Sequence, residues 1–241
     1  MYRLLLARIL VAMALILLSP SDPIAEESDG YVAMLREKVP GHERHTTGHF
    51  APMWEPMARQ MIEDYDLDAG VALDIGSSCS PFLIELAKRT DMTAYAVDID
   101  SWAMRLLGVM VDEAELTGRV IPVEGDWQDL PFKDDFADFI FSRGTIPFVP
   151  DQVQALRETY RVLKPGGVAF IGHGGFGRLL DPEDRDRLVA WRLAWDTGER
   201  ARPEGWDGPK EGLLDLAEEA GIPDAQLLTE PEVGWWLEIR K

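Results

Sequence analysis

The chain is poor in cysteine, in histidine and in positive charge. Cys79 is the only cysteine and there are four histidines in 241 residues, which excludes an internal disulfide and a cysteine metal cluster. Lys and Arg number 24 against 43 Asp and Glu, a formal net charge of −19. Such a surface repels nucleic acid and anionic lipid headgroups, so we expect neither as a binding partner. The length and the 46% hydrophobic content predict one α/β domain with additions.

Glycine is also scarce in the turn that carries the strongest signal of the chain. Residues 71–75 read as a buried strand, residues 76–80 as a tight turn of small residues, and residues 81–89 as a helix with proline in its first turn. A strand, a small-residue turn and a helix N-terminus together predict a nucleotide-cofactor site. A dinucleotide site needs G-x-G-x-x-G, whereas only Gly76 is glycine here. S-adenosylmethionine has no phosphate, so small hydroxyl side chains can replace those glycines.

The segments that follow repeat the alternation of strands and helices. Asp98 ends a second strand 24 residues after Asp74, close to the spacing at which an acid accepts hydrogen bonds from ribose hydroxyls. The remaining expected elements are strands at 119–125, 136–142, 168–171, 225–229 and 234–240, helices at 53–65, 152–163, 182–195 and 210–220, and a turn at 164–167. Alternating strands and helices indicate a largely parallel sheet.

Four of these segments resemble one family. Residues 73–76, 96–100, 125–132 and 160–167 resemble class I S-adenosylmethionine-dependent methyltransferases of the type-11 group, which includes quinone-biosynthesis C-methyltransferases. The resemblance implies a Rossmann-like α/β fold: a seven-stranded, mostly parallel sheet with helices on both faces and an antiparallel C-terminal strand. It implies S-adenosyl-L-methionine as the cofactor, and methyl transfer to a small-molecule acceptor by in-line displacement.

The same resemblance implies roles for individual residues of the cofactor site. Asp74 would hold the turn or bond the methionine amino group, and Gly76, Ser78 and Ser80 would let the carboxypropyl arm pass close to the backbone. Asp98 would accept both ribose hydroxyls and Ile99 would pack on adenine. Asp126 would accept from the exocyclic amine. Trp127 would pack beside the ring, although core packing is nearly as favoured for so large an aromatic residue.

Two further residues have two open roles each. Arg143 would bind the cofactor carboxylate or an anionic substrate, since a guanidinium fork pairs with carboxylate, or would be a solvated surface residue. His173 is the candidate general base for an acceptor that must lose a proton, with a loop hydrogen bond as the alternative.

The turn departs from the family pattern, because Ser78 and Ser80 stand where glycines are usual. Serine tolerates a positive φ and a close ligand less well than glycine. The alternative function is therefore a non-catalytic binding or regulatory protein on a decayed methyltransferase scaffold. A third alternative, an NAD-type oxidoreductase, is disfavoured by the same missing glycines.

Residues 28–68 are expected to form an N-terminal helical lid, followed by a methyltransferase domain at 69–241 with a cap insertion at 176–208. Three histidines, His42, His45 and His49, lie within residues 41–49, and Gly41 and Gly48 in the same segment favour a loop. No HExxH pattern is present, so we expect no metal site. We expect His45, His49 and Trp54 to contact the substrate, with an ordinary polar surface position as the alternative for the two histidines and core packing as the alternative for the helix that carries Trp54.

The N-terminal residues 1–27 resemble a signal peptide or a membrane anchor. Arg3 and Arg8 precede a ten-residue apolar run, Ile9–Leu18, as the positive residues of a signal peptide do. Residues 4–18 are fewer than the roughly 20 that a spanning helix needs. The segment predicts membrane association or export. Because S-adenosylmethionine is kept in the cytosol, a cytoplasmic protein with a misassigned start, for example at Met34, is the alternative.

Overall fold

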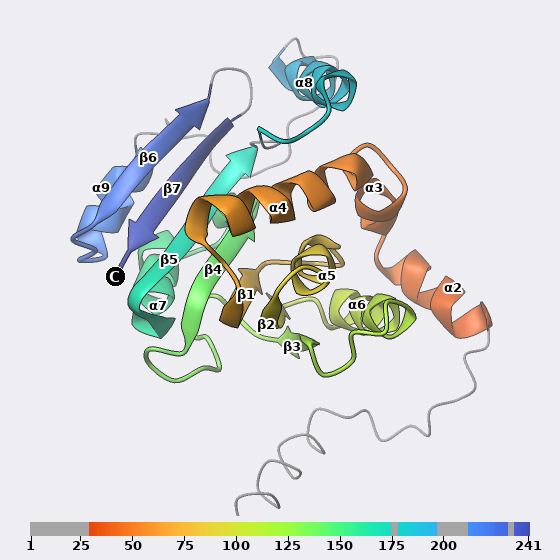
Figure 1. The fold of residues 1–241 in the computed structure, drawn as a ribbon, viewed down its shortest axis with the longest axis horizontal. Coiled ribbons are helices and arrows are strands. Elements are labelled where there is room, and N and C mark those ends of the chain that lie inside the picture. Colours follow the sequence, from red (N-terminus) through yellow and green to blue (C-terminus); the bar gives the residue numbers. More distant parts are fainter. Residues whose placement is uncertain (1–28, 175–177, 197–211, 231–233) are drawn as a thin grey trace, which may run out of the picture. The chain divides into compact units, whose positions relative to one another are not determined.

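A seven-stranded sheet organises the computed structural model, which describes residues 29–174, 178–196, 212–230 and 234–241 (Figure 1). Residues 1–34 and 35–241 form separate units, and the sheet lies in the second. The signal-like segment 1–27 falls outside the described residues, so membrane association and export through residues 4–18 stay predictions. Within the described part, no helix has the length and apolarity needed to cross a bilayer.

The strand order is β3-β2-β1-β4-β5-β7-β6. Strands β1 to β5 pair in parallel, β7 is antiparallel to β5, and β6 is antiparallel to β7. The sheet confirms the Rossmann-like fold that the sequence predicted. The strands are β1 (Ala69–Ile75), β2 (Asp91–Asp98), β3 (Val120–Glu124), β4 (Ala137–Arg143), β5 (Leu163–Gly174), β6 (Ala225–Glu230) and β7 (Gly234–Arg240).

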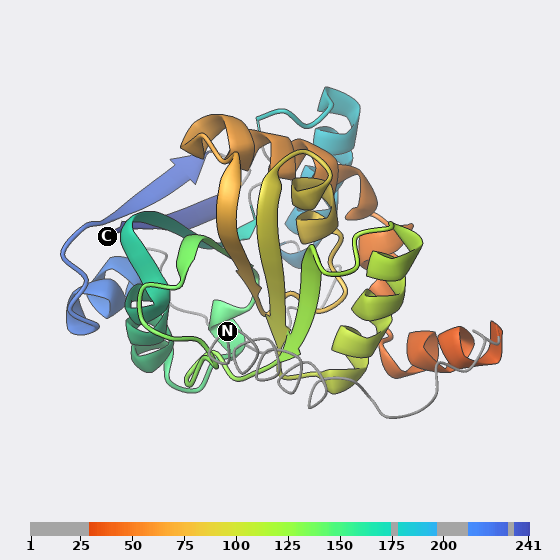
Figure 2. The same ribbon diagram turned by 60° about the horizontal axis from the view of Figure 1, so that its bottom comes forward.

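Helices cover both faces of the sheet (Figures 1 and 2). Helices α4, α5 and α6 lie on one face, and α7 and α9 lie on the other. The helices are α2 (Asp29–Lys38), α3 (His42–Thr46), α4 (Trp54–Tyr65), α5 (Phe82–Ala87), α6 (Ser101–Glu113), α7 (Gln152–Val162), α8 (Pro182–Asp196) and α9 (Gly212–Glu219), with short 3₁₀ turns η1 (Ala51–Met53) and η2 (Ile146–Phe148).

The central strands are buried on both faces, as a parallel sheet between two helix layers requires. On β4, Phe141 stacks on Phe82 of α5 with ring centroids 3.9 Å apart. Its neighbour Ile140 joins the opposite core with Leu156 of α7 and Leu213 of α9. Successive side chains of β4 therefore pack against the helix layers on opposite faces of the sheet.

Two local expectations were wrong. Residues 42–46, expected in a loop, form α3, because Gly41 adopts right-handed helical angles (φ −84°, ψ −12°) and Gly48 N–H closes the turn on Glu43 O at 2.6 Å. The turn expected at 164–167 is part of β5. There Gly166 takes φ +85° and the pairing with β4 shifts register, so the glycine pair makes a bulge rather than ending the strand.

Helix α4 confirms the amphipathic helix expected at 53–65, since Met57 and Met61 are 2% exposed. The described part of the expected cap insertion begins beside this helix. The Arg178 guanidinium binds Glu63 and Asp64 of α4 at 2.8 and 2.9 Å. Residues 175–177 and 197–211 of that region fall outside the described residues.

Candidate functional site

The strand order reverses between β1 and β4, and ligands of open α/β sheets bind beside the carboxyl ends of strands at such a point. Three strands end there with residues that the sequence singled out. The turn of residues 76–80 follows β1, Asp98 ends β2, and Arg143 ends β4. The topology therefore brings together residues separated by up to about 70 positions in the chain.

The turn after β1 is fixed to the end of β2. The N–H groups of Gly76 and Ser77 donate to Val97 O at 2.7 and 3.2 Å. The next N–H, that of Ser78, donates to the Asp98 carboxylate at 2.7 Å. The other carboxylate oxygen of Asp98 accepts from Asp100 N–H at 2.9 Å. Asp98 is thus held in one orientation, with further lone pairs left for a ligand.

The serines of the turn adopt the geometry of the glycines that they replace, or provide contacts that glycine lacks. Ser78 has φ +48° and Gly76 has φ +71°, so both occupy the left-handed region. Ser80 is 6% exposed, and its hydroxyl accepts from Phe82 N–H at 3.2 Å, at the start of α5. The serine-filled turn keeps a cofactor-type backbone, with strain concentrated at Ser78.

Replacing Ser78 by glycine should therefore raise the free energy of unfolding, by about 0.5–1 kcal/mol, because glycine adopts a positive φ without strain. The matched control is Ser77→Gly. Ser77 is 4% exposed and has no positive φ, so this change should lower stability. Urea denaturation of both variants measures the difference, and a loss of stability in Ser78→Gly would contradict the strain assigned to this residue.

Asp74 lies at the end of β1, 3% exposed. Its carboxyl group accepts no hydrogen bond from any described residue. Burial, and then the charge of Asp98, raise its pKa well above the usual range. Burial also raises the pKa of Asp98. Two carboxyl groups that repel each other fit a ligand that brings positive charge and hydroxyl groups, and they oppose a pyrophosphate. The residues present therefore fit S-adenosylmethionine better than a dinucleotide.

The expected adenine contacts fall into two groups. Ile99 is 72% exposed beside Asp98, which leaves its side chain available to an apolar ring. Asp126 is partly buried and accepts from Gln128 N–H at 2.9 Å. Trp127 is 4% exposed, and its indole N–H donates to Thr159 of α7 at 2.8 Å. Trp127 thus packs in the core, and its contact with adenine stays a prediction.

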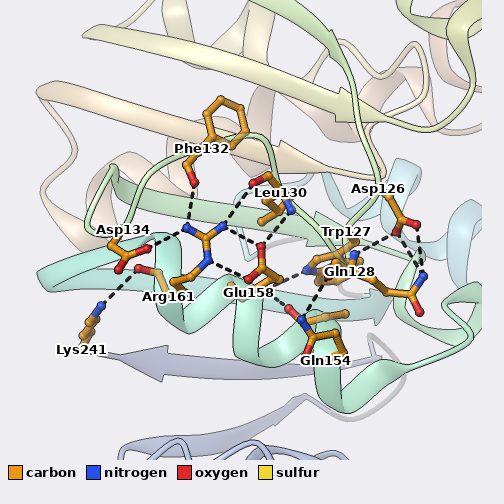
Figure 3. A network of polar contacts seen from close by, with 12 residues as sticks. Asp126, Trp127, Gln128, Leu130, Phe132, Asp134, Gln154, Glu158, Arg161 and Lys241 are labelled. Carbon is orange, nitrogen blue, oxygen red and sulfur yellow. Dashed lines mark hydrogen bonds and ion pairs between the residues drawn. The ribbon is translucent and has the colours of Figure 1, made fainter.

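A network of polar contacts fixes the loop that carries Asp126 (Figure 3). The Arg161 guanidinium on α7 binds Glu158 at 2.6 Å and donates to the carbonyl groups of Leu130 and Phe132 at 3.1 and 2.8 Å. Glu158 in turn accepts from Leu130 N–H at 2.9 Å. The loop after β3 is therefore anchored to α7 at several points, which sets the position of Asp126 at the sheet edge.

A second group of candidate residues surrounds Arg143. Its guanidinium lies over the rings of Phe50 and Trp54, 4.8 and 5.8 Å from their centroids. The His45 ring stacks on Trp54 at 5.5 Å, and the Trp54 indole N–H donates to His45 O at 2.9 Å. His49 packs edge-on against Phe50 at 4.3 Å. We call these five residues the Arg143 cluster. It unites the substrate residues expected from the sequence with Arg143.

Burial lowers the pKa of His45 to about 3, with Arg143, Arg44 and His49 contributing in the same direction. A histidine with a folded pKa below its unfolded value of 6.5 binds fewer protons when folded, so its stabilising effect is lost as pH falls from 6.5 towards 3. His45→Phe should therefore reduce the loss of stability on acidification, by up to about 2 kcal/mol at pH 5. Denaturation at pH 7.5 and pH 5 measures this, with His42→Phe as control. Equal acid sensitivity in wild type and His45→Phe would contradict the buried, neutral imidazole.

His173 lies in β5, where it pairs in register with Trp235 of β7. Its role as a general base stays a prediction. No group of three His, Cys, Asp or Glu side chains among the described residues could hold a metal ion.

Sequence reasoning missed the residues that support the site from other elements. The Thr145 hydroxyl donates to Gly76 O at 3.1 Å, and Phe50 lies against Arg143. Asp100 caps α6 by accepting from Trp102 N–H at 2.9 Å. Only Asp100 had a signal, as an acid immediately before a helical pattern. The other two contacts join distant parts of the chain.

Known proteins match the region just described. Residues 73–171 match the family model described as "Methyltransferase domain". A demethylmenaquinone methyltransferase of Staphylococcus carnosus is 33% identical over 98 residues, 41% of this chain and 40% of the relative. A ubiquinone/menaquinone biosynthesis C-methyltransferase of Geotalea daltonii is 37% identical over 104 residues, 42% and 44% of the two chains. The chain thus spans less than half the length of these curated relatives.

The fold has a solved counterpart over nearly the whole chain. The crystal structure of a putative S-adenosyl-L-methionine-dependent methyltransferase from Methanococcus maripaludis aligns with a TM-score of 0.73 and 28% identity, covering 91% of this chain and 97% of that one. These matches support the family resemblance, and the solved counterpart confirms the fold predicted from the sequence.

Proposed function

From the match of residues 73–171 to a methyltransferase domain, we propose that the protein transfers a methyl group from S-adenosylmethionine to a small-molecule acceptor by in-line displacement. The observation that carries the proposal is the pair of carboxyl groups at the switch point, of which Asp74 is buried and Asp98 is partly buried. Asp74 accepts no hydrogen bond from a described residue and Asp98 is held by two N–H groups. Together they suit a cationic cofactor with ribose hydroxyls.

In this proposal the residues of the chain bind and orient the cofactor and the acceptor, and they form no covalent bond with either. Asp98 would accept hydrogen bonds from the ribose hydroxyls, Asp74 would accept them from the ammonium group, and the turn of residues 76–80 would admit the carboxypropyl arm close to its backbone. Ile99 offers apolar surface to the adenine. When bound, S-adenosylmethionine supplies a methyl group already activated on a sulfonium. The protein then has to hold the acceptor in line and exclude water, which provides most of the rate of such reactions.

The same turn and carboxyl groups disfavour the two alternative functions. A dinucleotide would bring its pyrophosphate to a turn flanked by Asp74 and Asp98, where like charges repel. A decayed scaffold would have no reason to retain a strained left-handed Ser78 and a buried Asp74 that no described residue hydrogen-bonds, because both reduce stability. Both observations support the methyltransferase.

The test is methyl transfer from radiolabelled S-adenosylmethionine to a panel of small acceptors, with the full-length wild type and Asp98→Asn. The panel includes hydroquinones, because the relatives' names concern quinones, and carboxylic acids. Label in an acceptor with the wild type and not with Asp98→Asn supports the proposal. A folded wild type that binds no S-adenosylmethionine would overturn it in favour of the decayed scaffold.

A further inference from the structure

The Arg143 cluster differs in charge from the rest of the molecule. The chain has a formal net charge of −19, yet the charged groups that act on the His45 ring are Arg143, Arg44 and His49, all of them basic. Burial lowers the pKa of His45 most and these three groups lower it further, which keeps this imidazole neutral. A locally positive region at the carboxyl edge of the sheet, in a strongly acidic protein, favours an anionic ligand there.

The cation of this region is held in place by aromatic side chains. The guanidinium of Arg143 lies over Phe50 and Trp54, whose side chains are 8% and 3% exposed. Trp54 is itself fixed through its indole N–H to His45 O. Burial lowers the pKa of Arg143 to about 10, so the group stays charged at neutral pH. A planar, charged guanidinium group that already packs on two aromatic rings loses little conformational freedom when it binds a carboxylate.

A second hydrogen-bonding atom stands in the same cluster. Nδ1 of His45 is buried and has no hydrogen-bond partner among the described residues. A neutral imidazole carries one N–H, and in the tautomer with the proton on Nδ1 this group donates. A buried polar atom without a partner reduces stability unless a ligand or water satisfies it. The buried Nδ1 atom of His45 therefore indicates a ligand independently of the positive charge of Arg143.

We propose that the methyl acceptor is a carboxylic acid in its ionised form, and that Arg143 binds its carboxylate with the Nδ1–H of His45 as the second donor. The proposal rests on the proposed function and names its substrate class. It places Arg143 on the acceptor side of the site, because its guanidinium lies over Phe50, just before α4, and over Trp54, the first residue of α4. Arg143 is then a specificity-determining residue.

The test compares an anion with its neutral isostere on the full-length protein. Calorimetry first establishes saturation with S-adenosylhomocysteine, which carries no transferable methyl group. Fluorine NMR then follows titration with 4-fluorobenzoate and with 4-fluorobenzamide. The benzoate should bind at least about tenfold more tightly than the amide. Arg143→Met should abolish this preference, and Arg143→Lys should retain part of it.

The matched control is Arg105→Met, because the Arg105 guanidinium also lies over an indole, 5.7 Å from the Trp102 ring. This change should leave the preference for benzoate intact. Equal binding of the two probes to the wild type, or binding of neither, would overturn the proposal. An Arg143→Met variant that loses S-adenosylhomocysteine and keeps benzoate would instead assign Arg143 to the cofactor carboxylate. Failure of the proposed function is seen separately, in the first calorimetric step, as absence of cofactor binding.

Discussion

Replacing Gly76 by alanine should lower the free energy of unfolding by about 3 kcal/mol or more and abolish cofactor binding. Gly76 has φ +71°, a region that costs a residue with a side chain about 1–2 kcal/mol. A Cβ atom there would also stand 2.5 Å from Cβ of Thr145, and closer still to its Cγ2 and Oγ1. Overpacking of this kind adds about 1–3 kcal/mol. The turn would have to move away from η2, and the hydrogen bond from Thr145 to Gly76 O would be lost.

Gly118→Ala separates the two contributions. Gly118 has φ +81°, and a Cβ added there would meet nothing within 4 Å. This variant should lose only the about 1–2 kcal/mol of backbone strain. Thr145→Gly should restore part of the stability of Gly76→Ala, since the two residues are in direct contact. Denaturant titration of the four proteins measures this, and equal losses at Gly76 and Gly118 would contradict the role of Thr145.

Asp74→Asn should affect stability and binding in opposite directions. A carboxyl group whose folded pKa lies above its unfolded value of 3.8 takes up a proton on folding, so stability falls as pH rises from 3.8 through the folded pKa. The amide removes this penalty, and the cofactor-free variant should be more stable than the wild type at pH 7. The amide also loses the charge that attracts an ammonium group, so affinity for S-adenosylmethionine should fall by about tenfold to a hundredfold.

The comparison requires denaturation without cofactor and calorimetry with it, both at pH 7. Asp68→Asn is the matched control, because Asp68 is exposed just before the other end of β1. This variant should change neither quantity. A destabilised Asp74→Asn, or one that binds S-adenosylmethionine as tightly as the wild type, would show that Asp74 supports the turn rather than the cofactor.

The parts of the site that the sequence predicted are those encoded by local pattern. An apolar strand that ends in an acid, followed by small residues and a helix, places Asp74 and Asp98 at one edge once the strands pair in parallel. The structure confirms this sheet, with Asp74 opposite Ala96 and Asp98 opposite Glu124 in the register. The periodicity also predicted α4 and the C-terminal strand pair.

The parts that the sequence could not predict depend on contacts between distant segments. Gly76 has to be glycine because Thr145 packs on it, 69 residues later. Besides burial, the pKa of His45 is lowered by Arg143, which lies at the end of another element. The position of Trp127 also depends on a contact with a distant segment. The resemblance left contact with adenine and core packing both open for it, and the hydrogen bond to Thr159 on α7, which the sequence could not show, places the ring in the core.

Calorimetric titration of S-adenosylmethionine into the full-length protein tests the central claim most directly. The wild type should bind one equivalent, and Asp98→Asn should bind at least about thirtyfold more weakly, since it loses the charge and an acceptor for the ribose hydroxyls. Asp100→Asn should bind as the wild type does, because asparagine caps α6 as well as aspartate does. NAD⁺ should bind to none of them. A folded wild type that takes up no S-adenosylmethionine, or that binds NAD⁺ instead, would contradict the account.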